Sequence, residues 1–146
     1  MAVITNINDG GLAISPYNKK GIQYNAPCLI TRFTGLDGTS AGDTVLYTIS
    51  SSAGQLRITE VIINMVNSNN ITVTGVAEIN NFTFSTTICA STALTGLNAT
   101  NLWFPLYPVS SVQSQLASTN QVSINMTTPF TAVTATMNID IIGYFF

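Results

Sequence analysis

Apolar and polar residues alternate along much of this chain, which is the pattern of β-strands with one buried face. The alternation is clearest over residues 121–126 and 133–141, where every second residue is apolar. Other segments expected to form strands are residues 28–33, 44–49, 56–65, 71–79 and 82–89. Helical periodicity is weak throughout, and only residues 110–119 have spacing compatible with one or two helical turns.

The long segment around Glu60 changes phase. Leu56 and Ile58 fall on one face of an extended chain, but the apolar residues after Glu60 fall on the other face. Those residues are Val61, Ile63 and Met65. A β-bulge, or a strand that bends between two sheets, would produce this change.

Turn residues and prolines mark the ends of these segments. Gly35–Gly38 and Asn67–Asn70 are typical turn clusters, and the second predicts a hairpin between the strands that flank it. Pro105 and Pro108 confine the aromatic segment 102–108 to a sheet edge or a crossing loop, because proline cannot donate to a strand ladder.

Eight or so strands separated by turns indicate an all-β fold: a single antiparallel β-sandwich, jelly-roll-like or Ig-like, over residues 28–146. Residues 1–27 lack sustained alternation and contain several glycines and prolines. We expect an irregular N-terminal arm there, which either decorates its own domain or reaches a neighbouring subunit.

Composition supports one folded domain. The chain has 146 residues, of which 46% are hydrophobic, too many for a disordered chain. Its 13 Ser, 21 Thr and 15 Asn favour strands, turns and loops over helix interiors. Apolar runs are too short to span a membrane. The first residues carry no basic region before an apolar one, so we expect no signal peptide.

Charge excludes several classes of function. Only 7% of the residues are charged, the net charge is −2, and the basic residues are four: Lys19, Lys20, Arg32 and Arg57. Backbone recognition of nucleic acid and binding to anionic membranes are therefore not expected. Histidine is absent, which removes Ser-His and Cys-His nucleophile systems and the commonest transition-metal ligand.

Cys28 and Cys89 are 61 positions apart, which matches neither a disulfide framework nor a zinc site. We expect two buried free thiols, with a disulfide between them as the alternative.

Carboxylates are few, and they favour no catalytic site. The chain has six: Asp9, Asp37, Asp43, Glu60, Glu78 and Asp140. Isolated acids on solvent faces of strands are the ordinary interpretation, so we expect no enzyme. Asp37 and Asp43 could supply oxygens to Ca²⁺, but turn formation by Asp-Gly is the favoured interpretation, and no cofactor or metal is expected.

A small domain with so little charge is typical of a protein that buries much of its surface against other copies or another protein. The expected contacts lie in two regions. In the arm they are Ile4, Ile7, Leu12 and Ile14, and in the aromatic segment they are Trp103, Phe104 and Tyr107. Stacking of Trp103 and Tyr107 on sugar, with Asn98 and Asn101 donating hydrogen bonds, is the alternative.

Part of the sequence resembles small virion proteins of tailed bacteriophages. Residues 46–64 read LYTISSSAGQLRITEVIIN, followed by Asn67-Ser68 and the ITVT of residues 71–74. The family pattern has LYTVPAGK, an alternating strand ending in Asn, a turn with Ser, and VTVT. Here Ser51 or Ser52 stands at the proline and Gln55 at the lysine, while the last strand ends in a similar Gly143-Tyr144.

The resemblance implies a non-enzymatic accessory protein of the virion that is often trimeric. A capsid decoration or cement protein, bound to the major capsid protein on the capsid surface, is the leading hypothesis. A tail or fibre module that binds a receptor or carbohydrate is the alternative. The resemblance implies no catalytic residues.

Overall fold

The structure is a computed structural model that describes residues 26–146, and this part contains nine β-strands and no helix. The strands are β1 (Cys28–Asp37), β2 (Gly42–Thr48), β3 (Leu56–Asn69), β4 (Val76–Asn81), β5 (Thr86–Ala93), β6 (Trp103–Leu106), β7 (Gln115–Leu116), β8 (Gln121–Thr128) and β9 (Thr134–Phe145).

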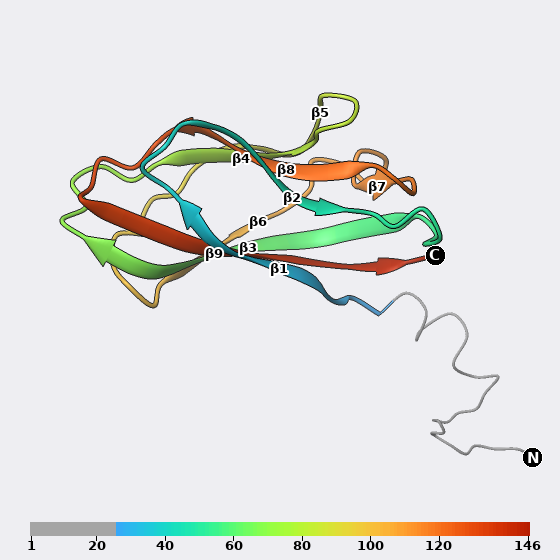
Figure 1. The fold of residues 1–146 in the computed structure, drawn as a ribbon, viewed down its shortest axis with the longest axis horizontal. Coiled ribbons are helices and arrows are strands. Elements are labelled where there is room, and N and C mark those ends of the chain that lie inside the picture. The colour runs from blue at the N-terminus through green and yellow to red at the C-terminus, as the bar shows by residue number, and fades with distance from the viewer. Residues whose placement is uncertain (1–25) are drawn as a thin grey trace, which may run out of the picture.

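The strands form two antiparallel sheets that stack as layers (Figure 1). Sheet one has the order β1-β9-β3-β6, with β7 also paired to β3, and sheet two has the order β2-β8-β4-β5. The pairs β1–β9, β2–β8, β3–β6 and β4–β5 are nested along the sequence. This nesting of eight strands in two sheets is a jelly roll, so the predicted antiparallel sandwich is confirmed in its jelly-roll form.

The core lies between the two sheets and is built from the inward-facing residues of every long strand. On β3 and β9, the two central strands of sheet one, the fully buried residues alternate with half-buried ones. Sheet two contributes the same pattern from β4 and β8. The largest buried side chains are Ile49, Leu56, Ile58, Ile63, Met65, Ile79, Ile88, Leu94, Leu97, Leu116, Ile124 and Met126.

The phase change near Glu60 is a β-bulge in β3, as predicted. Ile58 pairs with Gly143 and Glu60 pairs with Ile142, so Thr59 is an extra residue on β3. Ile58 and Val61 are three positions apart and would point to opposite faces of a regular strand. The bulge between them directs both side chains to the core, where both are buried.

Two of the predicted turns lie elsewhere. Gly35 forms a bulge within β1, with a φ of 79°, and the chain turns after Asp37 instead. Residues 67–69 continue β3, and the hairpin predicted around them is wrong, because β3 and β4 belong to different sheets. The chain crosses between the sheets over residues 70–75, where Val73 forms an isolated bridge to Thr131.

Two further segments differ from expectation. Residues 82–85, predicted to begin a strand, form the turn that joins β4 to β5. Residues 110–119 contain a turn, with the amide of Ser114 donating to the carbonyl of Ser110, then the short strand β7, and a second turn at residues 118–119. The edge position predicted from Pro105 and Pro108 is confirmed, because β6 is the last strand of sheet one.

The predicted arm lies almost wholly outside the described residues, as do its proposed contacts Ile4, Ile7, Leu12 and Ile14. Ala26 and Pro27 are exposed and lead directly into β1. At the other end, Phe146 exchanges two backbone hydrogen bonds with Gln55, so the C-terminus lies beside the loop between β2 and β3 (Figure 1).

Candidate interaction surface

The aromatic segment divides between the surface and the core. Trp103 and Tyr107 are each 62% exposed, whereas Phe104, which lies between them, packs against the core. Alternation along the edge strand β6 explains the division, since neighbouring residues of a strand point to opposite faces. Together with Leu102 and Val109, which are also exposed, Trp103 and Tyr107 form an apolar surface that we call the edge patch.

The edge patch follows the edge strand β6 and the segment after it. β6 pairs with β3 of sheet one, and immediately afterwards Pro108 bridges Cys89 while the amide of Val109 donates to the carbonyl of Ile88. The segment therefore crosses from the edge of sheet one to the edge of sheet two and leaves its aromatic rings on the outside. Exposed aromatic residues at a sheet edge are typical of protein contacts and sugar-binding platforms.

A hollow of about 250 Å³ lies next to the edge patch, on the outer face of sheet one. Asn64 lines it and is the direct cross-strand neighbour of Trp103. Its other lining residues are Arg32, Met65, Val66, Asn101, Leu102 and Asn138. We call it the sheet-one hollow. It brings Asn101, one of the predicted sugar contacts, close to the edge patch, whereas Asn98 is an exposed residue of the preceding loop and does not line it.

An ion pair lies on the same outer face of sheet one. Arg32 on β1 donates from Nε and Nη2 to the two carboxylate oxygens of Asp140 on β9, at 2.6 and 2.7 Å. The Nδ2 of Asn64 donates to Oδ2 of Asp140 at 3.3 Å. Asp140 holds the pKa of Arg32 above its ordinary value, chiefly through the hydrogen bond and then through its charge. The charge of Asp140 is therefore compensated, and this face is close to neutral.

A second exposed aromatic site was not anticipated. Phe82 and Phe84, placed in a strand by the sequence pattern, lie in the turn between β4 and β5 and are 44% and 66% exposed. The Oδ1 of Asn81 accepts a hydrogen bond from the amide of Thr83, which is the turn-forming use of asparagine. The sequence signal that could have predicted this turn was therefore Asn80-Asn81 before the two phenylalanines, together with Ser85 after them.

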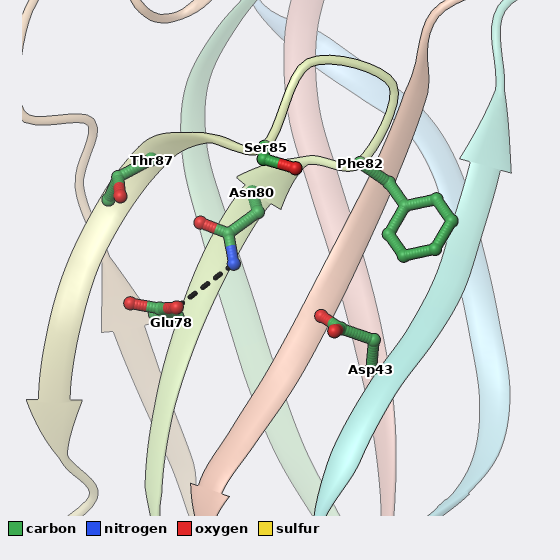
Figure 2. A pocket seen from close by; sticks show the side chains of 6 residues that line it. All are labelled: Asp43, Glu78, Asn80, Phe82, Ser85 and Thr87. Carbon is green, nitrogen blue, oxygen red and sulfur yellow. Dashed lines mark hydrogen bonds between the residues drawn. The ribbon is translucent and has the colours of Figure 1, made fainter.

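A second hollow, of about 230 Å³, lies on the outer face of sheet two below this turn. Figure 2 shows its six lining residues: Asp43, Glu78, Asn80, Phe82, Ser85 and Thr87. Asp43 comes from β2 and Glu78 from β4, and the β8 residue Asn125 is the cross-strand partner of both. We call this the sheet-two hollow.

The remaining predicted sites are simpler. Asp37 accepts hydrogen bonds from the amide and hydroxyl of Thr39 and from the hydroxyl of Ser40, and the bonds to Thr39 chiefly lower its pKa. The turn interpretation of Asp37 is thus confirmed.

Within residues 26–146, no group of three or more His, Cys, Asp or Glu side chains could hold a metal ion. No helix in this range is long and apolar enough to cross a bilayer.

Both cysteines are free thiols, so the alternative of a disulfide between them does not hold. Cys89 is buried as expected, and burial raises the pKa of its thiol to about 12. Cys28 is exposed, which corrects the prediction that both would be buried, because it lies at the very start of an edge strand.

Comparison with known proteins supports the fold. No family model matches the sequence, and no curated protein matches it. A chain of the cyanophage Pam1 capsid asymmetric unit is similar in structure, with a TM-score of 0.55 and 11% sequence identity. The alignment covers 97% of this chain and 99% of that chain.

A chain of the structure of deformed wing virus, a honeybee pathogen, gives a TM-score of 0.44 at 12% identity. The alignment covers 99% of this chain but only 55% of the virus chain.

Proposed function

We propose that this chain is a non-enzymatic structural protein of a virion, and specifically a decoration or cement protein on the surface of a capsid. One observation carries the proposal: the fold is similar to that of a chain of a phage capsid unit, in an alignment that covers 97% of this chain and 99% of that chain. Jelly rolls also serve as lectins and enzymes, so the choice among these roles rests on the surface.

The surface is suited to contact with other proteins. Among residues 26–146, Arg32 and Asp140 neutralise each other, and Asp37 is held within its own turn. Apolar side chains are exposed along the edge patch. A surface of this kind loses little on desolvation, because few charges have to leave water when it is buried.

A decoration protein acts through many copies. Each contact with the major capsid protein can be weak, because copies joined in an oligomer bind together and dissociate slowly. We propose a homo-oligomer, with a trimer favoured, in which the edge patch and the N-terminal arm contribute contacts. Trp103 and Tyr107 supply exposed aromatic area, while Phe104 supports the strand from beneath.

Rebinding to capsids tests this proposal. Particles assembled without the chain are incubated with purified protein, and bound copies are counted after sedimentation, together with the temperature at which the capsids break. We expect saturable binding and a higher breakage temperature. Trp103→Ala with Tyr107→Ala should weaken binding at least tenfold, whereas Phe84→Ala removes an equally exposed aromatic ring elsewhere and should leave binding unchanged. Capsids that neither bind the protein nor gain stability would refute the proposal.

Mass in solution tests the oligomer. Light scattering across a concentration series should give three times the 15.5 kDa chain mass. A variant lacking residues 1–20 should keep the wild-type thermal unfolding but lose this mass, if the arm joins the subunits. A monomer at every concentration would contradict the homo-oligomer, and a deletion variant that unfolds would contradict the role of the arm.

A second candidate function is carbohydrate or receptor binding by a tail or fibre module. The observation that favours it is the position of the sheet-one hollow, whose amides of Asn64 and Asn101 lie next to the exposed Trp103. Amide groups and an aromatic face together suit a sugar ring. Saturable binding on a glycan panel that is lost in both Trp103→Ala and Asn101→Ala, but kept in Phe84→Ala, would establish this function. A panel with no saturable ligand would remove it.

A further inference from the structure

The sheet-two hollow carries an uncompensated negative charge. The two cationic side chains among residues 26–146 lie on sheet one, where Arg32 pairs with Asp140 and Arg57 lies 5.8 Å from the ring centre of Phe146. No basic residue lines the hollow, whereas Asp43 and Glu78 both do. In the described part of the chain, the carboxylate of Asp43 has no hydrogen-bond or ion-pair partner among the side chains around it.

Glu78 is held in place with one oxygen free. The side-chain amides of Asn80 and Asn125 both donate to Oε2, at 3.0 and 3.4 Å. Figure 2 shows the bond from Asn80, with the other carboxylate oxygen directed away from it. Among residues 26–146, nothing donates to Oε1. A carboxylate oriented by two amides and left with a free oxygen is prepared to accept a hydrogen bond from a ligand.

A buried hydroxyl on the same face also lacks a partner. Ser123 on the central strand β8 is completely buried, and its Oγ has no hydrogen bond. Its cross-strand neighbours are Val45 on β2 and Asn80, which lines the hollow. Because Val122 and Ile124 face the core, alternation directs Ser123 to the outer face. Buried hydroxyls are nearly always paired, so Ser123 is an unsatisfied polar group directly beside Asn80, at the edge of the hollow that it does not itself line.

The positions of the lining side chains favour one kind of cationic ligand over another. Asp43 and Glu78 are on strands that flank β8 on either side, so their backbones are separated by two strand spacings, about 10 Å. A calcium ion needs six to eight oxygens within about 2.6 Å, and within residues 26–146 no group of three or more His, Cys, Asp or Glu side chains could hold a metal ion. A guanidinium group is planar, presents five donors and stacks on aromatic rings, and the exposed ring of Phe82 borders the hollow.

We infer that the sheet-two hollow binds an arginine side chain of a partner protein, with Glu78 and Asp43 accepting its hydrogen bonds and Phe82 covering its face. The inference does not require the virion role, because the residues that line the sheet-two hollow are all outside the edge patch. If the proposed function also holds, the arginine belongs to a neighbouring protein of the particle.

Titration followed by NMR tests the inference. The ¹⁵N-labelled full chain is titrated with N-acetyl-arginine-N-methylamide, and with the citrulline analogue, which has the same shape without the charge. We expect saturable shifts around residues 78–87 with a Kd of the order of 1–10 mM, a range normal for one side chain, and at least tenfold weaker binding of citrulline. Glu78→Gln and Asp43→Asn should each weaken arginine binding about fivefold or more.

Controls separate this site from others. Glu60→Gln removes an acid from β3 in the other sheet and should leave the affinity unchanged. The spectra of the variants without ligand show whether each is folded, and a second carboxylate variant provides the test if one is not. Equal binding of arginine and citrulline would overturn the inference. So would wild-type affinity in both carboxylate variants, or tight binding of CaCl₂ at the same residues.

Discussion

Arg32 and Asp140 form a two-pronged ion pair across β1 and β9, 108 positions apart in sequence, with both nitrogen–oxygen distances below 2.8 Å. The carboxylate is nearly buried, whereas half of the arginine side chain remains exposed. The pair therefore attaches the edge strand β1, which continues from the arm, to a central strand of the sheet. It also compensates the charge of Asp140 on that outer face.

We predict that either partner stabilises the domain only in the presence of the other. Arg32→Met leaves Asp140 with only the amide of Asn64, and Asp140→Asn removes the charge that orients Arg32. Each variant should lower the Tm by roughly 3–6 °C, and the double variant by less than the sum of the two. Thermal unfolding followed by circular dichroism measures this. Strict additivity would show that the two side chains act independently.

Asp37 should give a pH-dependent contribution to stability. Its pKa lies below the ordinary value of 3.8, so its ionised form is favoured by folding. That stability is present above pH 4 and is lost as the pH falls below 3.8 towards the folded-state pKa. Because the carboxylate is exposed, Asp37→Asn should cost only about 0.5–1 kcal/mol at pH 7.

Urea unfolding of both proteins at pH 7 and at pH 2.5 checks this prediction. The gap between wild type and Asp37→Asn should close at the lower pH. A gap that stays the same at both values would mean that the asparagine disturbs the turn for another reason.

The two thiols should differ strongly in reactivity. Cys28 is exposed at the start of β1, whereas Cys89 is buried and has a pKa of about 12, so almost none of it is thiolate at pH 8. A thiol reagent should modify one cysteine per folded chain and two per chain in denaturant. Cys28→Ser should abolish the rapid reaction and Cys89→Ser should preserve it. Two equally fast reactions in the folded protein would contradict the burial of Cys89.

Gly143 marks a place where two central strands meet too closely for a side chain. A Cβ there would collide with the backbone carbonyl of Arg57, at the pair next to the bulge of β3. Gly143→Ala should therefore cost at least about 2–3 kcal/mol, because backbone cannot move aside as a side chain can.

Gly96 is the matched control for this glycine. It has a φ of 89° but open space around it, so Gly96→Ala should cost only about 1 kcal/mol. Urea unfolding compares the two variants. Equal losses would show that backbone conformation, rather than close packing, requires Gly143.

Strand periodicity predicted most of the fold, because burial of one face dictates which residues can occupy alternate positions. The phase change around Glu60 even located the bulge of β3. The order of the strands could not be predicted in the same way, since the pairing of β1 with β9 joins residues that are 99 to 115 positions apart, as from Asp37 to Thr136 and from Cys28 to Gly143. For this reason the segment around Asn70 was interpreted as a hairpin, although the chain there crosses from one sheet to the other.

The candidate surfaces were predicted only in part. Trp103 and Tyr107 were identified because a proline-interrupted aromatic segment cannot lie inside a sheet, and both are exposed. Alternation alone would have placed Phe104 on the other face, where the structure has it. The sheet-two hollow was not predictable, because Asp43, Asn125 and Glu78 come together only through the order of three strands.

The most direct test of the central claim is to measure where the chain is in purified virus particles. Particles from the native source are separated into head and tail fractions, and the copies of the chain per particle are counted by quantitative mass spectrometry. A capsid decoration protein should be found in the head fraction at high copy number, in constant ratio to the major capsid protein. Absence from the particles would contradict a structural role, and a few copies confined to the tail would contradict the capsid assignment.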